Sequence, residues 1–137
     1  MTKLSIRAGG FGFSGILEWD KAPQTCSAFD KMLPYESQLV HVRWSGEGVW
    51  IPLGEYQFGV GYENHTSHPA PGQFILYPGG ISETEILLAY GGVMFSSKMG
   101  QLAGNHFLTL TEGQEQLMDL GNRVLWKGAQ EISFDYA

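Results

Sequence analysis

Hydrophobic residues alternate with small or polar residues along much of the chain, which is the pattern of half-buried β-strands. The alternation is clear in residues 4–6 and 11–19, and Gly9-Gly10 between them predicts a β-hairpin. Further strands are predicted at residues 37–44, 49–51, 73–77, 83–88, 93–95, 107–110 and 132–136. The chain is therefore expected to be mainly β.

Two segments have helical spacing instead. Apolar residues recur every three or four positions in residues 26–33, after Asp20 as a suitable N-cap and before Pro34 as a stop signal. The same spacing in residues 117–125 predicts a second helix. Gly121 lies inside that helix, where glycine is unfavourable, so the helix is expected to pack closely against the sheet.

The chain shows no repeat, linker or low-complexity tract, and its 137 residues are expected to form a single domain, 1–137. Residues 54–72 are rich in Gly, Pro, Asn and His and have little periodicity. Long irregular segments in compact domains often carry function.

Charge narrows the range of partners. The formal net charge is −6 and no basic cluster occurs, which argues against nucleic acid and anionic membrane surfaces as partners. The single cysteine, Cys26, excludes an intrachain disulfide. The start of the chain lacks a signal-peptide core, so we expect a cytoplasmic protein. Only 16% of the residues are charged, which favours burial of some surface in a homo-oligomer.

Two segments carry a resemblance to a known family. Gly104-Asn105-His106-Phe107-Leu108-Thr109 resembles the cyclophilin sequence Gly-Ser-Gln-Phe-Phe-Ile-Thr. Residues 20–29 resemble the cyclophilin helix opening Ala-Pro-Lys-Thr-Val-Glu-Asn-Phe. The resemblance implies a closed or near-closed cyclophilin-like β-barrel with two short helices at its ends.

The chain as a whole resembles an uncharacterised bacterial family of small cyclophilin-like proteins. The strings that carry this resemblance are residues 41–47, 62–66, 77–85 and 100–107. The family implies the fold and no established activity, so the function has to be argued from the site itself.

The sequence also departs from true cyclophilins, which isomerise prolyl peptide bonds. Arg43, in His41-Val42-Arg43, corresponds to the cyclophilin arginine. His106 replaces the substrate-contacting glutamine, and residues 48–52 replace the Met-x-Gln-Gly-Gly-Asp-Phe run. These losses argue against a prolyl isomerase, which is kept as an alternative together with a proline-peptide binder.

Arg43 is the first candidate for ligand binding. A guanidinium can bind a carboxylate through two hydrogen bonds and can stack on Trp44 or Trp50. The alternative is a structural ion pair with Glu47 or Glu55. His41 would share the strand face of Arg43 and so line the same pocket.

The candidate catalytic residues are His106, Glu83 and Glu85. His106 follows Asn105 at the start of a strand, where an imidazole can act as a base or the residue can instead be part of the core. Glu83 and Glu85 share a strand face, and repulsion between them can raise one pKa for acid–base work. An exposed strand edge protected by charge is the alternative for this pair.

The remaining ligand-binding candidates are Tyr62, Glu63, Asn64, Tyr77 and Asn105. His65 and His68 are the only pair whose spacing suggests metal ligands. They do not lie on a predicted helix and the sequence marks no third ligand, so we assign no metal and no cofactor.

Together these residues predict a pocket for a small molecule that carries a carboxylate or an amide. Its walls would be indole rings, and Arg43 and His106 would converge on it. The residue types permit proton transfer or hydrolysis and do not separate an enzyme from a binding protein. A non-catalytic oligomeric assembly protein is a further alternative.

Overall fold

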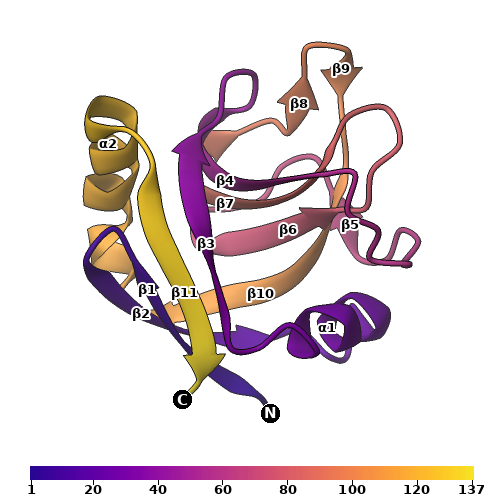
Figure 1. Ribbon diagram of the computed structural model, residues 1–137, viewed down its shortest axis with the longest axis horizontal. Helices are drawn as coiled ribbons and strands as arrows, with labels where there is room; N and C mark the ends of the chain where they lie inside the picture. The colour runs from indigo at the N-terminus through magenta and orange to yellow at the C-terminus, as the bar shows by residue number, and fades with distance from the viewer.

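A computed structural model describes all residues 1–137 and shows a closed antiparallel β-barrel with two helices (Figure 1). Eight strands pair in the order β2-β1-β11-β3-β4-β7-β6-β10, and pairing of β10 with β2 closes the ring. The barrel strands are β1 Lys3–Ala8, β2 Phe11–Leu17, β3 Tyr35–His41, β4 Gly46–Gly54, β6 Gln73–Tyr77, β7 Thr84–Val93, β10 Gly104–Glu112 and β11 Gln130–Tyr136. The prediction of a mainly β barrel is confirmed.

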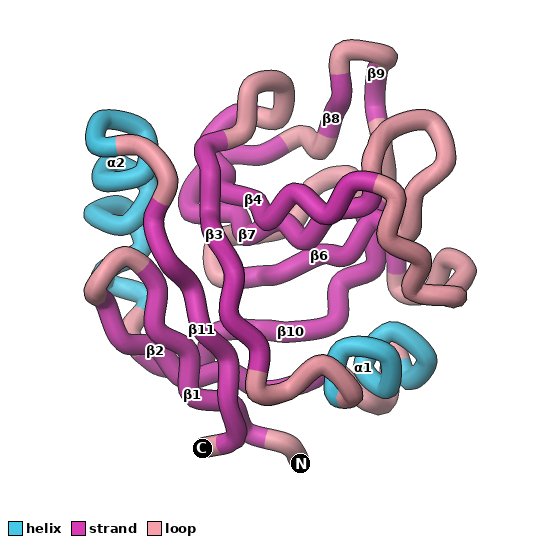
Figure 2. Tube along the Cα trace, viewed as in Figure 1, coloured by secondary structure: helices cyan, strands magenta, loops and turns pink.

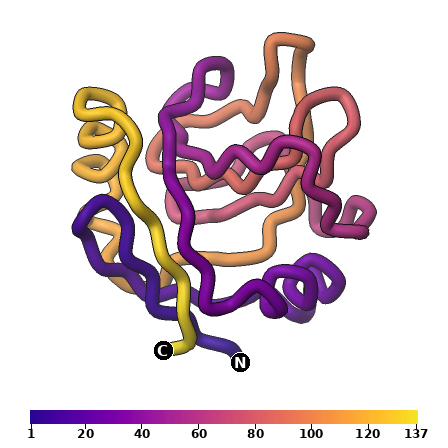
Figure 3. The backbone as a smooth tube through the Cα atoms, in the orientation of Figure 1, coloured from indigo at the N-terminus to yellow at the C-terminus, as the bar shows by residue number.

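The remaining elements are short additions to this ring. A two-residue strand, β5 (His65–Thr66), pairs with β10, and a small separate hairpin consists of β8 (Ser96–Ser97) and β9 (Gly100–Gln101). Figure 2 shows how little regular structure lies between β4 and β6, as the sequence predicts. Both termini lie side by side (Figure 3), because β1 pairs with β11.

The two helices lie at different ends of the barrel and close its interior (Figure 1). Helix α1 (Pro23–Asp30) contributes Cys26 and Phe29 to the core, and α2 (Leu117–Lys127) contributes Leu120 and Val124. A 3₁₀ turn, η1 (Gln114–Gln116), precedes α2. Three details of the prediction are corrected. The N-cap of α1 is Ala22 rather than Asp20, α1 ends before Met32, and Leu125 is exposed.

The barrel has two hydrophobic cores, because strands β4, β6 and β7 are covered on both faces. The interior core contains 24 buried residues. A second core of seven lies on the outer face and consists of Ile75, Tyr77, Leu87, Ala89, Val93, Phe95 and Leu102. Leu87 and Ala89 alternate along β7 with Ile86 and Leu88, which belong to the interior core. Residues 94–103, called here the outer hairpin, cover this second core.

The outer hairpin replaces the strand predicted at residues 93–95. Val93 ends β7, and Phe95 leaves the sheet so that its ring packs edge-on against Tyr77, with centroids 5.7 Å apart. Of these three residues, Val93 still belongs to β7 and Met94 is exposed, so only the hydrophobicity of Phe95 reflects burial beneath the hairpin. Burial of Phe95 is complete.

Gly121 is expected to be intolerant of a side chain. A Cβ at this position would collide with the ring of Tyr90, so the close helix packing predicted from the sequence is present. Gly121→Ala should lower the free energy of unfolding by about 1–3 kcal/mol, despite the better helix propensity of alanine. Urea unfolding measures the change, with Asn122→Ala on the exposed face of α2 as the control. Equal midpoints for Gly121→Ala and the control would contradict this packing.

Candidate functional site

A pocket opens between the β3–β4 connection, the start of β7 and the outer hairpin. Its volume is about 220 Å³. We call it the Arg43 pocket, and its lining residues are Val42, Arg43, Trp44, Ser45, Trp50, Ser82, Glu83, Glu85, Ser96, Ser97 and Lys98. Five of the twelve residues predicted for the site line it, namely Arg43, Trp44, Trp50, Glu83 and Glu85.

The pocket lies against the second core. Val42 and Trp50 pack against that core and also line the pocket, so its inner wall is apolar. Trp50 lies opposite Val40 on β3 and Leu87 on β7, which fixes the indole on the outer face of the sheet. The pocket is thus a break in the cover that the outer hairpin provides.

Glu85 is the buried acid of this pocket. It lies directly across from Tyr77 in the β6–β7 pairing, and only 6% of the residue is exposed. No hydrogen bond or ion pair with a protein group satisfies its carboxyl, and its oxygens are not sealed from solvent. Burial raises the pKa of Glu85 from 4.5 to about 8, and the negative charge of Glu83 contributes to the rise. The carboxyl is consequently protonated at neutral pH.

Arg43 forms the outer wall together with Trp44. Its guanidinium carbon is 5.7 Å from the centroid of the Trp44 ring, within the range of a cation–π contact. The alternative ion pairs with Glu47 and Glu55 are absent. Glu47 accepts a hydrogen bond from the Gly92 amide instead. The Arg43 guanidinium is therefore available to a ligand.

Serine side chains join the outer hairpin to the β3–β4 connection. The Ser45 hydroxyl donates to the Ser96 carbonyl at 3.1 Å and accepts from the Ser96 amide at 3.0 Å. On the opposite wall, the Tyr77 hydroxyl accepts hydrogen bonds from the amides of Ile81 and Ser82. Tyr77 is buried, so it supports the wall and does not line the pocket.

His41 does not share the pocket with Arg43. Strand β3 ends at His41, so alternation along the strand does not extend to residue 43. The His41 ring lies 2.7 Å from the Tyr90 hydroxyl and 2.8 Å from the Val42 carbonyl, and Tyr90 belongs to the interior core.

His106 is also separate from Arg43, so the predicted convergence of these two residues is wrong. Thr109 donates its only hydroxyl hydrogen to Glu18 at 2.6 Å, and His106 Nε2 lies 2.7 Å from the same oxygen. Nε2 must therefore carry a hydrogen and donate it to Thr109. Burial lowers the pKa of His106, although the nearby Glu18 acts in the opposite direction.

Asn105, Glu63 and Asn64 fasten the irregular segment to the barrel. The Asn105 side chain is fully buried, donates to Thr25 and to the Gly61 carbonyl, and accepts from the Glu63 amide. Glu63 in turn accepts from the amide and the hydroxyl of Thr25. Asn64 donates to the His106 carbonyl. This network is satisfied internally and lies apart from the Arg43 pocket.

Tyr62 also lies outside the Arg43 pocket, where its ring is 5.1 Å from that of His65. His65 and His68 belong to no group of three or more ligating side chains suited to a metal ion.

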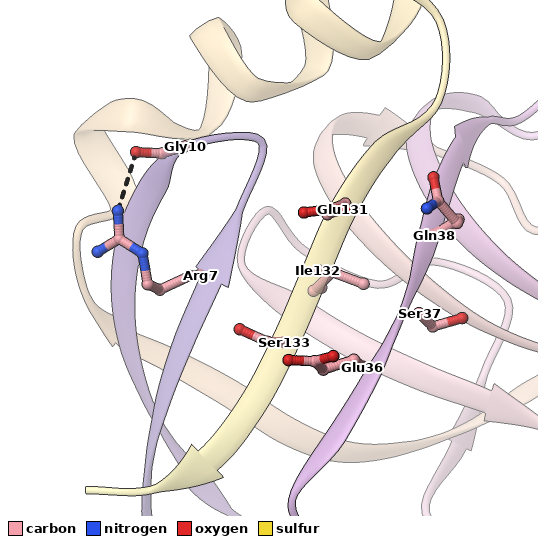
Figure 4. A pocket seen from close by; sticks show the side chains of 8 residues that line it. All are labelled: Arg7, Gly10, Glu36, Ser37, Gln38, Glu131, Ile132 and Ser133. Carbon is pink, nitrogen blue, oxygen red and sulfur yellow. Dashed lines mark hydrogen bonds between the residues drawn. The ribbon is translucent and has the colours of Figure 1, made fainter.

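A larger hollow of about 450 Å³ lies on the outer face of β1, β11 and β3 (Figure 4). Figure 4 shows its side chains spread along the strands, with Arg7 turned back to the Gly10 carbonyl. Ile132 is its one hydrophobic lining residue. Glu36 and Glu131 are exposed, so this hollow has no buried acid comparable with Glu85.

The pocket residues that sequence reasoning did not assign to the site are Val42, Ser45, Ser82, Ser96, Ser97 and Lys98. Among these residues only Lys98 stands out in the sequence, because cationic residues are scarce and it lies next to the Gly100–His106 segment. The serines take their place from the fold of the outer hairpin and of the loop before β7.

No helix in the structure has the length and apolar character needed to span a membrane.

Comparison with solved structures supports the barrel. McbB, in a structure determined in complex with tryptophan, has a TM-score of 0.73 and 16% identity, over 96% of this chain and 44% of McbB. The chain thus spans less than half of McbB. The solution structure of the hypothetical protein AF2241 from Archaeoglobus fulgidus has a TM-score of 0.61 and 16% identity, over 99% of this chain and 95% of AF2241.

At 16% identity these two similarities show the fold alone, and neither protein is described as a cyclophilin. A search of curated proteins found no significant match. A family model, described as a protein of unknown function (DUF3830), matches residues 4–136. The chain therefore belongs to the DUF3830 family.

Proposed function

We propose that the Arg43 pocket binds a small organic molecule that carries a carboxylate or an amide. The observation that carries this proposal is Glu85, a buried carboxyl without a protein partner that borders a cavity. Since its oxygens still reach solvent, a ligand that fills the pocket would displace that solvent and take over as the hydrogen-bond partner of the carboxyl. Arg43 supplies a donor fork suited to a carboxylate, and Trp50 supplies apolar contact.

Proton transfer is the reaction that this pocket supports best. A protonated carboxyl held in an apolar site can donate a hydrogen bond or a proton to a ligand oxygen. No histidine lines the pocket, and the hydroxyls of Ser45, Ser96 and Ser97 donate to backbone carbonyls rather than to a base that could activate a nucleophile. Hydrolysis through a serine–histidine pair is therefore not part of the proposal. McbB, 44% of which matches this chain, is described in complex with tryptophan, and a small-molecule ligand for this chain is consistent with that description.

A thermal-shift screen against a library of small carboxylates and amides tests the proposal. We expect ligands that raise the melting temperature of the wild type and lose this effect, with affinity reduced at least about tenfold, in Arg43→Ala. Arg7→Ala is the matched control, because Arg7 is an exposed strand arginine that lines the other hollow. An absence of hits, or hits lost in Arg7→Ala and retained in Arg43→Ala, would contradict the assignment.

A homo-oligomer is a second proposal, supported by the outer face of α2. Met118, Leu125 and Trp126 lie on this face, and 78% of Trp126 is exposed. We expect sedimentation at micromolar concentration to show a species larger than a monomer, and Trp126→Ser to shift it toward the monomer. A monomeric wild type would contradict the proposal. Prolyl isomerase activity has no comparable support, because His106 lies outside the Arg43 pocket.

A further inference from the structure

The Arg43 pocket contains charges of both signs that do not pair with one another. Arg43 and Lys98 line it together with Glu83 and Glu85. Lys3 with Glu112 is the ion pair of the protein, and His106 and Glu18 would form a second one only with a protonated imidazole. No cationic nitrogen of the pocket therefore lies within 4.0 Å of its carboxylates. Two cationic and two acidic side chains thus line a cavity of about 220 Å³ without forming ion pairs with one another.

The bases and the acids come from different walls. Arg43 belongs to the β3–β4 connection and Lys98 to the turn of the outer hairpin, whereas Glu85 lies at the start of β7 and Glu83 directly before it. A ligand with only a negative charge could accept a hydrogen bond from protonated Glu85 but would bring no cation to Glu83 or Glu85. A ligand with only a positive charge would leave Arg43 and Lys98 unused. A zwitterion satisfies both walls at once.

The apolar part of the pocket limits the rest of the ligand. Val42 and Trp50 continue the second core into the pocket, and Trp44 lies beside the guanidinium of Arg43. An aliphatic or aromatic group placed on these side chains would be removed from water, which favours binding in proportion to the apolar area buried. The volume suits a single residue rather than a peptide.

We propose that the ligand is a free α-amino acid with an apolar side chain. Its ammonium would contact Glu85, its carboxylate would contact Arg43 and Lys98, and its side chain would pack on Trp50. This inference rests on the proposed function, because it assigns a ligand class to the same pocket.

Binding of an ammonium should ionise Glu85. The titratable groups that line the pocket with Glu85 are Glu83, Arg43 and Lys98, and Tyr77 lies opposite Glu85 in the β6–β7 pairing. None of them forms an ion pair with it, so the empty pocket favours the protonated acid. A cation brought within hydrogen-bond distance favours the carboxylate instead, and the proton leaves for solvent. At pH 7, complex formation should therefore release a proton.

Titration calorimetry with sets of three related probes tests the inference. Each set contains an L-amino acid, the same molecule without its amino group and the same molecule without its carboxyl group. For phenylalanine these analogues are 3-phenylpropionate and 2-phenylethylamine, and parallel sets cover valine, leucine, methionine and tryptophan. We expect at least one amino acid to bind about tenfold more tightly than either analogue, with a heat that depends on buffer ionisation as proton release requires.

Two variants locate the charges. Glu85→Gln should remove the preference over the deaminated analogue and the proton release, and Arg43→Ala should remove the preference over the decarboxylated analogue. Both variants can be verified as folded by circular dichroism. If deaminated analogues bind as tightly as the amino acids, or if only library carboxylates bind, the proposal of a zwitterionic ligand is wrong, whereas the proposal that the Arg43 pocket binds a small molecule is retained. If nothing binds, the proposed function fails as well.

Discussion

Glu85→Gln is expected to make the protein more stable than the wild type above pH 8. In the wild type the folded state keeps a proton on Glu85 up to about pH 8, whereas the unfolded chain releases it near pH 4.5. Since the folded state binds more protons in this interval, stability must fall as the pH rises through it. Glutamine does not titrate, so the variant lacks this loss.

The effect should reach a few kcal/mol at pH 9, because each pH unit between the two pKa values contributes up to about 1.4 kcal/mol. Below pH 4.5 the wild type and the variant should be about equally stable. Urea unfolding at pH 4.5, 6, 7.5 and 9 measures the difference at each point.

Glu83→Gln is the matched control for this experiment. Glu83 is exposed, and its negative charge helps to raise the pKa of Glu85. The control should therefore keep the decline in stability with pH and move its alkaline end to a lower pH. Parallel stability curves for wild type and Glu85→Gln between pH 5 and 9 would show that Glu85 is not a buried acid.

The ring of strands could be predicted because each strand carries its own local signal. Gly9-Gly10 marks a hairpin whose two strands pair as expected, and the strand predicted at residues 132–136 pairs with β1. The alternation of residues 83–88 placed Glu85 on one face of a strand. Period-two patterns report faces, and the pattern is correct within β7. It does not hold for His41 with Arg43 or for Glu83 with Glu85, because β3 ends at His41 and β7 begins at Thr84.

The sequence could predict only those parts of the site that depend on which face of a strand a residue occupies. Glu85 and Trp50 lie on the outer face of adjacent strands, so the pattern of burial brought them together. The outer hairpin was missed because β8 and β9 have two residues each, too few to show alternation. Its position depends on long-range burial of Phe95, which no local pattern encodes.

The pairing of Arg43 with His106 failed for a related reason. Resemblance to a motif places residues on strands, but it does not say which neighbours surround them. Here the Thr109 hydroxyl and Glu18 occupy the surroundings of His106. The candidate acid near Arg43 is Glu85 instead, which lines the Arg43 pocket together with Trp50 and residues of the outer hairpin.

Phe95→Ala should have the largest effect on stability, because Phe95 is the only aromatic residue that the outer hairpin contributes to the second core. Truncating a fully buried phenylalanine costs about 3–5 kcal/mol, since burial is lost and a cavity remains. The second core has only seven buried residues, so little packing remains to hold the hairpin over β7. Urea unfolding measures the loss, with Met94→Ala as the exposed neighbouring control.

In Phe95→Ala the Arg43 pocket should be disrupted under conditions where the barrel is still folded. Ser96, Ser97 and Lys98 line the Arg43 pocket from the outer hairpin, and their positions depend on the burial of Phe95. Phe134→Ala is the matched comparison, because Phe134 is equally buried but belongs to the interior core. At a temperature where both variants are folded, we expect ligand binding to be lost only in Phe95→Ala. Loss of binding in both variants, or in neither, would show that the hairpin does not form the pocket wall.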